Sequence, residues 1–198
     1  MMNKEYKLKI KRNDIEPTIG RVLVAEPTTY DFFFSRSIVL LLEHEDREGS
    51  AGVILNKKIS DNFKDIYNKS KIKADFPLYL GGPVDTNKLF VLHRLGDIIP
   101  KSFEVIPGLW WGGDVKTIYT LVNNKIANNN NLKVFQGYSG WAPMQLREEM
   151  KKNYWAVTEL SIDEIFEMPV ETMWKKCIEN LGPEYEFWQH IPENPTFN

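Results

Sequence analysis

The strongest fold signal in the sequence is the segment SIVLLLEHEDREGSAGVILN, residues 37–56. Two runs of leucine and β-branched residues flank a polar stretch, which is the pattern of a β-hairpin. We predict strands over 37–44 and 51–56, with Gly49 taking the positive φ that a tight reversal often needs. The apolar run 38–42 is far shorter than the roughly 20 residues that cross a membrane as a helix, so it indicates a strand of a folded core.

Strands dominate the rest of the first half of the chain, and helices become frequent in the second half. Apolar runs bounded by proline and glycine predict further strands over 21–25, 77–80, 89–94, 102–106, 132–136 and 155–160. Helices are predicted over 143–152 and 170–181, with a short helix or turn near 61–68. This order favours an α+β fold, a single domain with a mixed β-sheet flanked by helices.

The clearest helix signal begins at Asp114, which can accept a hydrogen bond from the first turn as an N-cap. The apolar residues that follow it are spaced to form one stripe on a helix. They are Val115, Ile118, Tyr119, Val122 and Ile126. A second start signal is the capping box of Ser161 and Glu164.

The composition is that of one globular domain: 198 residues, 42% hydrophobic and 26% charged, which excludes a disordered chain. The 25 basic and 27 acidic residues leave a net charge of −2, so the chain lacks the positive field of a non-specific nucleic-acid binder. The charge is nevertheless uneven, at +4 over 57–73 and −7 over 159–198. A single cysteine, Cys177, and a charged N-terminus without an apolar signal segment lead us to expect a cytoplasmic protein.

Three segments carry a specific resemblance. They are GRVLVAEPTTYDFFFSRSIVLLLEHEDREGSAGVILNK at 20–57, LYLGGPV at 78–84 and QGYSGWAPMQLREEMKKNYW at 136–155. Over about residues 19–182 the chain resembles the AlgH/YqgE family of bacterial proteins, whose pattern includes LxAxP, GGPV and GY-[AS]-GW-x-x-x-QL-x-x-E. The chain departs from that pattern in the stretch GLWWGGD at 108–114 and in a polar tail after Gly182.

The resemblance implies a cytosolic α+β domain built around a curled mixed sheet. It also implies a role in transcriptional regulation, which rests on a genetic association with exopolysaccharide control. The resemblance assigns no catalytic residue and no cofactor. We divide the chain into an N-terminal arm over 1–18, an AlgH/YqgE-like domain over 19–182 and an acidic aromatic tail over 183–198. We expect a non-enzymatic regulatory or binding protein, monomeric or homodimeric, with an unknown protein or small molecule as its partner.

The candidate ligand or partner cleft is predicted where polar side chains gather at the strand ends near the hairpin, since loops at strand ends often carry binding sites. Glu43, His44 and Asn56 supply polar groups there, and Arg36 adds positive charge if the fold brings it close. The full set of candidate residues is Arg36, Glu43, His44, Asn56, Gly81, Gly82, Tyr138, Ser139, Trp141 and Gln145.

Ser139 leaves a small enzyme, such as a hydrolase, open as the alternative. The sequence GYSG at 137–140 is similar to the nucleophile elbow G-x-S-x-G, in which a strand-to-helix turn exposes a serine, although its second glycine comes one place early. Bases for such a serine are available in His44, His93 and His190. The alternative interpretation of the motif is structural: Gly137 and Gly140 allow a tight turn. A hydrolase would instead require a histidine within hydrogen-bond distance of Ser139.

Other common chemistries are not predicted. Residues 43–46, EHED, hold metal-binding side chains, but adjacent strand residues face opposite ways and no second histidine follows at helical spacing, so we predict no metal. The glycine pairs at 81–82 and 112–113 lack the Lys-Ser/Thr of a phosphate loop, and we predict no cofactor. Without a helix-turn-helix pattern we expect no sequence-specific DNA binding, and we expect no membrane partner.

The tail over 183–198 has too much proline for a central strand and too little apolar periodicity for a helix. Its aromatic residues are nevertheless costly to leave in water. We therefore expect an extended strap, with Phe187 and Trp188 packed on the chain's own surface, and the groove of a partner subunit as the alternative.

Overall fold

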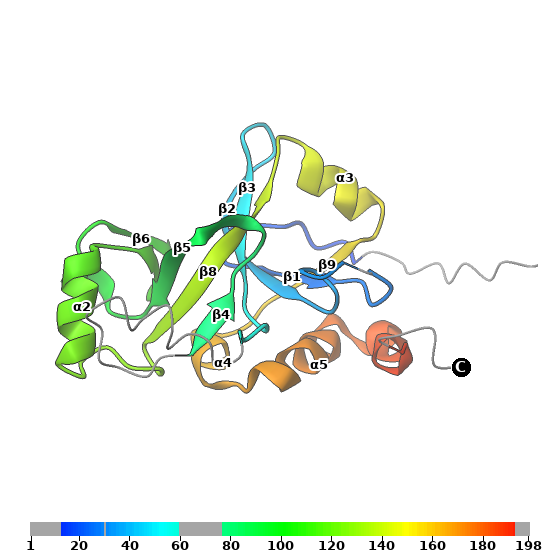
Figure 1. Cartoon of the computed structure of the whole chain (residues 1–198). Helices are drawn as coiled ribbons and strands as arrows, with labels where there is room; N and C mark the ends of the chain where they lie inside the picture. Colours follow the sequence, from blue (N-terminus) through cyan, green and yellow to red (C-terminus); the bar gives the residue numbers. More distant parts are fainter. Residues whose placement is uncertain (1–12, 30, 60–76, 193–198) are drawn as a thin grey trace, which may run out of the picture.

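A computed structural model describes residues 13–29, 31–59 and 77–192. Within these residues nine strands form one open sheet in the order β6-β7-β5-β8-β3-β2-β1-β9, and β4 pairs with β8 (Figure 1). The β4–β8 pair is parallel and the other pairs are antiparallel, so the sheet is mixed. The α+β fold predicted from the sequence is confirmed.

The elements have the following bounds. The strands are β1 (Val22–Ala25), β2 (Ile38–Glu45), β3 (Gly49–Ile54), β4 (Leu78–Leu80), β5 (Val84–His93), β6 (Ser102–Ile106), β7 (Leu109–Gly112), β8 (Leu132–Trp141) and β9 (Trp155–Thr158). The α-helices are α2 (Val115–Asn123), α3 (Gln145–Lys151), α4 (Ile162–Glu167) and α5 (Val170–Leu181). Two 3-10 helices are η1 (Gly96–Ile98) and η2 (Pro183–His190). The predicted helix or turn over 61–68 lies outside the described residues.

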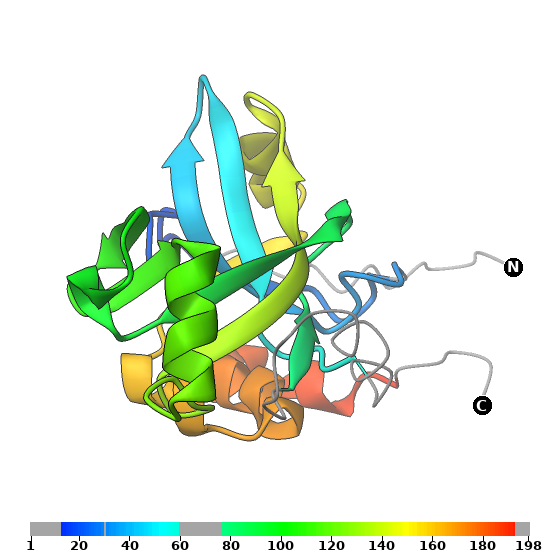
Figure 2. The same ribbon diagram turned by 60° about the vertical axis from the view of Figure 1, so that its left-hand side comes forward.

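The β2–β3 hairpin forms as predicted and projects from the sheet (Figure 2). Gly49 has the expected positive φ, +113°, and lies directly after the turn as the first residue of β3. The first five residues of β2, 38–42, are buried on both sides of the sheet. Ile38 and Leu40 pack in the cluster that includes α4 and α5, whereas Val39 and Leu41 pack with the buried residues of α3. Burial on both faces explains why the strand is continuously apolar rather than alternating.

Helix α2 covers a third cluster at the other end of the sheet, against β5 and β8. Its predicted cap is confirmed, because the side chain of Asp114 accepts a hydrogen bond from the Thr117 N–H at 3.0 Å. The predicted stripe is wrong at its ends: Val115 is 59% exposed and Ile126 is 50% exposed, while Leu121 is buried. The helix ends at Asn123, so Ile126 lies beyond it, whereas Ile118 and Val122 are buried as predicted. Val115, in the first turn, leaves part of the apolar surface of the helix uncovered.

The signals at the later helices are confirmed. Ser161 and Glu164 form the predicted capping box at the start of α4, and α5 has the predicted bounds. No helix in the described part of the chain is long and apolar enough to cross a membrane.

The tail was expected to be extended, and this expectation is wrong for the part that the structure describes. Pro183–His190 forms the 3-10 helix η2, in which Tyr185 and Trp188 are three residues apart and so lie on one side of the helix. Both side chains are buried in the cluster under α5, at 2% and 1% exposure. Trp188 thus packs on its own chain as expected, but it does so within the core.

Candidate functional site

The sequence GYSG at 137–140 lies inside strand β8, not in a strand-to-helix turn. Gly137 has φ +69°, and a Cβ there would lie 2.5 Å from the carbonyl oxygen of Gly82. A Cβ on Gly82 would lie 2.3 Å from the carbonyl carbon of Tyr138. The corner between β4 and β5 crosses β8 so closely that the two backbones are in contact. Neither Gly82 nor Gly137 therefore has room for a side chain. A Cβ at Gly140 would meet nothing closer than 3.5 Å, so the turn role predicted for that glycine is wrong.

The surroundings of Ser139 do not resemble those of a nucleophile. Its side chain is completely buried, and its hydroxyl donates a hydrogen bond to the carbonyl of Gly81 at 3.1 Å. Two of the three histidines predicted as bases have other partners: Nδ1 of His44 lies 2.8 Å from the hydroxyl of Ser50, and Nδ1 of His93 accepts from the N–H of Leu95. The burial of Ser139 and its bond to the Gly81 carbonyl support a structural role for the motif.

Several other candidate residues serve the framework. The side chain of Asn56 accepts from the N–H of Ile38 and donates to the carbonyl of Arg36, at 2.9 and 2.8 Å, and so fixes the start of β2. The guanidinium of Arg36 stacks on Trp174 of α5, on the other side of the sheet from α3. Glu43 is exposed on β2, and the ring of Tyr138 packs edge-on against Phe90. The predicted set therefore does not form one site.

Trp141 and Gln145 are the two candidates that share a cleft. The cleft has a volume of about 550 Å³ and lies between α3, the end of β8, the segment after β1 and Pro83. Its aromatic lining is Phe34, Trp141, Tyr154 and Trp155, and its polar lining is Glu26, Thr28, Thr29, Asp31, Gln145 and Glu149.

Glu149 organises the floor of this cleft. One of its carboxylate oxygens accepts hydrogen bonds from the indole N–H groups of both Trp141 and Trp155, each at 2.8 Å. The other oxygen accepts from the side-chain amide of Gln145 at 2.9 Å. Buried indole N–H groups need an acceptor, so one carboxylate on α3 fixes both rings, which meet edge to face at 5.8 Å.

Two more carboxylates face the cleft. Glu26 is 8% exposed and accepts hydrogen bonds from the backbone and the hydroxyl of Thr28. Asp31 accepts from the N–H groups of Phe33 and Phe34 at 2.8 and 2.9 Å. Every donor to these side chains is uncharged, and the lining in the described part of the chain includes no lysine or arginine. The positive charge that Arg36 was expected to add is missing here, and the cleft is acidic.

Sequence reasoning missed all three carboxylates of the cleft, Glu26, Asp31 and Glu149. Glu149 could have been predicted, because Trp141, Gln145 and Glu149 are spaced four residues apart within the family motif at 136–155. Glu26 gave no comparable signal. It is a polar residue after a short strand, and only the fold brings it opposite α3.

Two buried titratable groups lie on the sheet outside the cleft. Burial lowers the pKa of Lys133 to about 8, and its ammonium donates a hydrogen bond to the hydroxyl of Tyr79 at 3.0 Å. Burial also lowers the pKa of His93 from 6.5 to about 4. Neither group lines the cleft.

His93 should make the fold sensitive to acid. Between pH 6.5 and about 4 the unfolded chain binds a proton that the folded chain excludes, so the free energy of unfolding should fall by about 3 kcal/mol as the pH is lowered through this window. The variant His93→Gln cannot titrate there. Urea unfolding at several pH values should show that the wild type loses its advantage over the variant on acidification, and parallel profiles would contradict the account.

The comparisons with known proteins all indicate the same family. The sequence profile of the AlgH-like family, DUF179, matches residues 22–186. A UPF0301 protein of Parabacteroides distasonis is 39% identical over 191 residues, and one of Bacteroides thetaiotaomicron is 40% identical over 192 residues. Each of these alignments covers 96% of both chains.

Two solved structures share the fold. The solution structure of the AlgH protein from Pseudomonas aeruginosa has a TM-score of 0.69 at 23% identity, and the match covers 91% of this chain and 98% of that one. The crystal structure of protein DIP2367 from Corynebacterium diphtheriae has a TM-score of 0.68 at 22% identity, covering 90% and 94%. At these identities the likeness establishes the architecture alone.

Proposed function

The chain belongs to the AlgH-like family, and from this premise we propose that it is a non-enzymatic regulatory or binding protein of the bacterial cytoplasm whose ligand or partner group occupies the cleft beside α3. One observation carries the proposal: the three segments by which the chain resembles the family meet at this cleft. Glu26 comes from 20–57, and Pro83 comes from 78–84. The segment 136–155 supplies the floor.

The charge of the cleft indicates the chemistry of its occupant. Glu26, Asp31 and Glu149 hold their positions through uncharged donors, so their negative charge is not balanced by an ion pair within the described residues. Aromatic rings beside these carboxylates also attract cations. The volume of about 550 Å³ falls in the usual range of ligand sites, roughly 300–1,000 Å³. The occupant is therefore an ammonium or guanidinium group, carried by a small molecule or by a basic side chain of a protein.

A binding role fits the hydrogen bonds of these carboxylates better than catalysis does. Glu149 uses both oxygens to hold the two indoles and Gln145, so moving a proton on or off this group would disturb the floor of the site. Regulation by this protein then acts through a ligand or a protein partner, not through the reading of DNA bases.

Replacing Glu26 by glutamine tests the proposal, because it removes a charge at the cleft while keeping the shape of the side chain. Calorimetric titration at low salt with arginine methyl ester should show binding to the wild type that weakens by roughly fivefold to tenfold in Glu26→Gln. Glu43→Gln, a change at an exposed position outside the cleft, should bind as the wild type does.

Citrulline methyl ester is the matched ligand control, since it keeps the shape of arginine but is uncharged at the end of the side chain. It should bind more weakly than arginine methyl ester, and added salt should reduce this difference. Equal affinity for both esters would contradict a guanidinium occupant, and an equal effect of the Glu26 and Glu43 variants would contradict any cationic occupant.

A further inference from the structure

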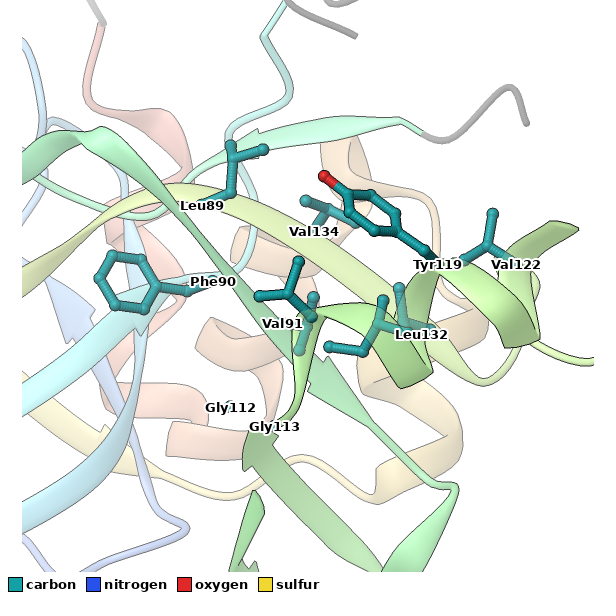
Figure 3. Close-up of a pocket in the computed structure, with 11 residues that line it drawn as sticks. Leu89, Phe90, Val91, Gly112, Gly113, Tyr119, Val122, Leu132 and Val134 are labelled. Carbon is teal, nitrogen blue, oxygen red and sulfur yellow. The ribbon is translucent and has the colours of Figure 1, made fainter. Parts of the chain in front are cut away.

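A second hollow lies between α2 and the sheet, apart from the acidic cleft (Figure 3). Its volume is about 210 Å³. It is lined by three groups of residues: Leu89, Phe90 and Val91 of β5, Leu132 and Val134 of β8, and Gly112, Gly113, Val115, Ile118, Tyr119 and Val122 at and before α2. It shares no lining residue with the acidic cleft.

Tyr119 is the distinctive residue of this cavity. Its ring reaches from α2 toward Leu89 and Val134, whereas the ring of Phe90 points away from the cavity (Figure 3). Phe90 stacks instead on Trp111 at 5.6 Å. The Tyr119 hydroxyl is the one side-chain polar group among the described lining residues, and the other lining side chains are apolar.

The mouth of the cavity leaves apolar surface in water. Val115 is 59% exposed and Leu89 is 43% exposed, although both line the hollow. Val115 belongs to the stripe that the sequence predicts to be covered. Exposed apolar surface costs roughly 25 cal/mol per Å², and gathered around a concave site it is a typical mark of a ligand position.

We propose that this cavity binds a small uncharged ligand, aromatic or short-chain, with one hydrogen-bonding group placed at the Tyr119 hydroxyl. A charged ligand would lose its hydration without gaining an ionic partner, because none of the lining residues that the structure describes has a charged side chain. Size restricts the class further. An apolar cavity of roughly 150 Å³ holds a benzene molecule, so about 210 Å³ admits one substituted ring and excludes a peptide helix.

The probes that test this are 4-methylphenol, toluene and benzoate, followed by the methyl signals of valine and leucine in NMR spectra of the full chain. Toluene and 4-methylphenol should shift the signals of Val115 and Val134 at submillimolar to millimolar concentrations, and 4-methylphenol should bind more tightly. Benzoate, which has similar size but carries a charge, should not bind. Tyr119→Phe should remove the advantage of 4-methylphenol and leave toluene binding unchanged.

Two variants at exposed apolar residues, Val115 in α2 and Ile126 after the end of α2, distinguish binding in the cavity from non-specific apolar binding. Val115→Phe adds bulk at the mouth and should weaken toluene binding by roughly tenfold. Ile126→Phe adds the same ring type at a residue that is 50% exposed but does not line the cavity, and it should have no effect. Thermal melts of both variants check that the fold is kept.

Three outcomes would overturn the proposal. They are equal binding of toluene by both variants, binding of benzoate as tight as that of 4-methylphenol, and methyl shifts that follow protein concentration rather than ligand, which would indicate contact between copies of the chain. The acidic cleft is tested with cations and with other residues, so failure here leaves the proposed function intact.

Discussion

Replacing Gly137 by alanine is expected to lower the free energy of unfolding by roughly 3 kcal/mol or more. A Cβ at this residue has to accept the left-handed conformation at φ +69°, and it would approach two carbonyl oxygens, those of Gly82 and Val84, to 2.5 and 2.8 Å. The conformation alone costs roughly 1–2 kcal/mol, and backbone contacts of this kind cannot relax by a rotamer change.

Gly140→Ala is the matched control, three residues along the same strand. Its Cβ would make ordinary contacts at 3.5 Å, and the expected change is within about 1 kcal/mol. Chemical denaturation of both variants measures the difference. If the two alanines are equally tolerated, the crossing of β8 by the β4–β5 corner does not explain the glycine motifs.

Trp188→Ala carries the second large effect. Trp188 is 1% exposed in the core under α5, and removing a buried aromatic side chain typically costs roughly 3–5 kcal/mol. Phe32→Ala, at a residue that is 80% exposed, should change the free energy of unfolding by less than about 0.5 kcal/mol.

Sedimentation of the Trp188 variant distinguishes the two roles considered for the tail. Because the indole packs within its own chain, the oligomeric state should stay the same while the melting temperature falls. A change in oligomeric state at unchanged melting temperature would instead place Trp188 in the groove of a partner subunit.

The parts of the fold that could be predicted are those whose causes are local. The hairpin follows from two apolar runs and Gly49, and the helix starts follow from Asp114 and Ser161, whose side chains bond to residues three positions away. The continuation of β8 through 137–141 could not be predicted, because the glycines at 137 and 140 are typical of a turn. Gly137 is required by a contact with Gly82, which lies far away in the sequence.

The candidate site was predicted only in part for a similar reason. Trp141 and Gln145 lie in a recognised motif, and Glu149 completes it four residues later. Asn56 and Arg36 look like site residues because they are polar groups beside the hairpin. Their partners across the fold give them framework roles instead, and those partners cannot be identified from the neighbouring sequence.

The tail shows how local rules can fail at a terminus. Proline at 183 argues against a strand, and a short aromatic stretch gives no helical period. A 3-10 turn needs only a spacing of three, which Tyr185 and Trp188 provide. Packing under α5 then decides the conformation.

The central claim is that the cleft beside α3 receives a cationic group, and the indole N–H signals of Trp141 and Trp155 report on it most directly. Both indoles donate to Glu149, so their NMR signals should shift together when arginine methyl ester is added. Intermolecular NOEs should connect the ligand to the rings that line the cleft. The account predicts saturable shifts of both signals that are much smaller in Glu26→Gln. Unchanged indole signals at saturating ligand, or NOEs to residues outside the cleft, would contradict it.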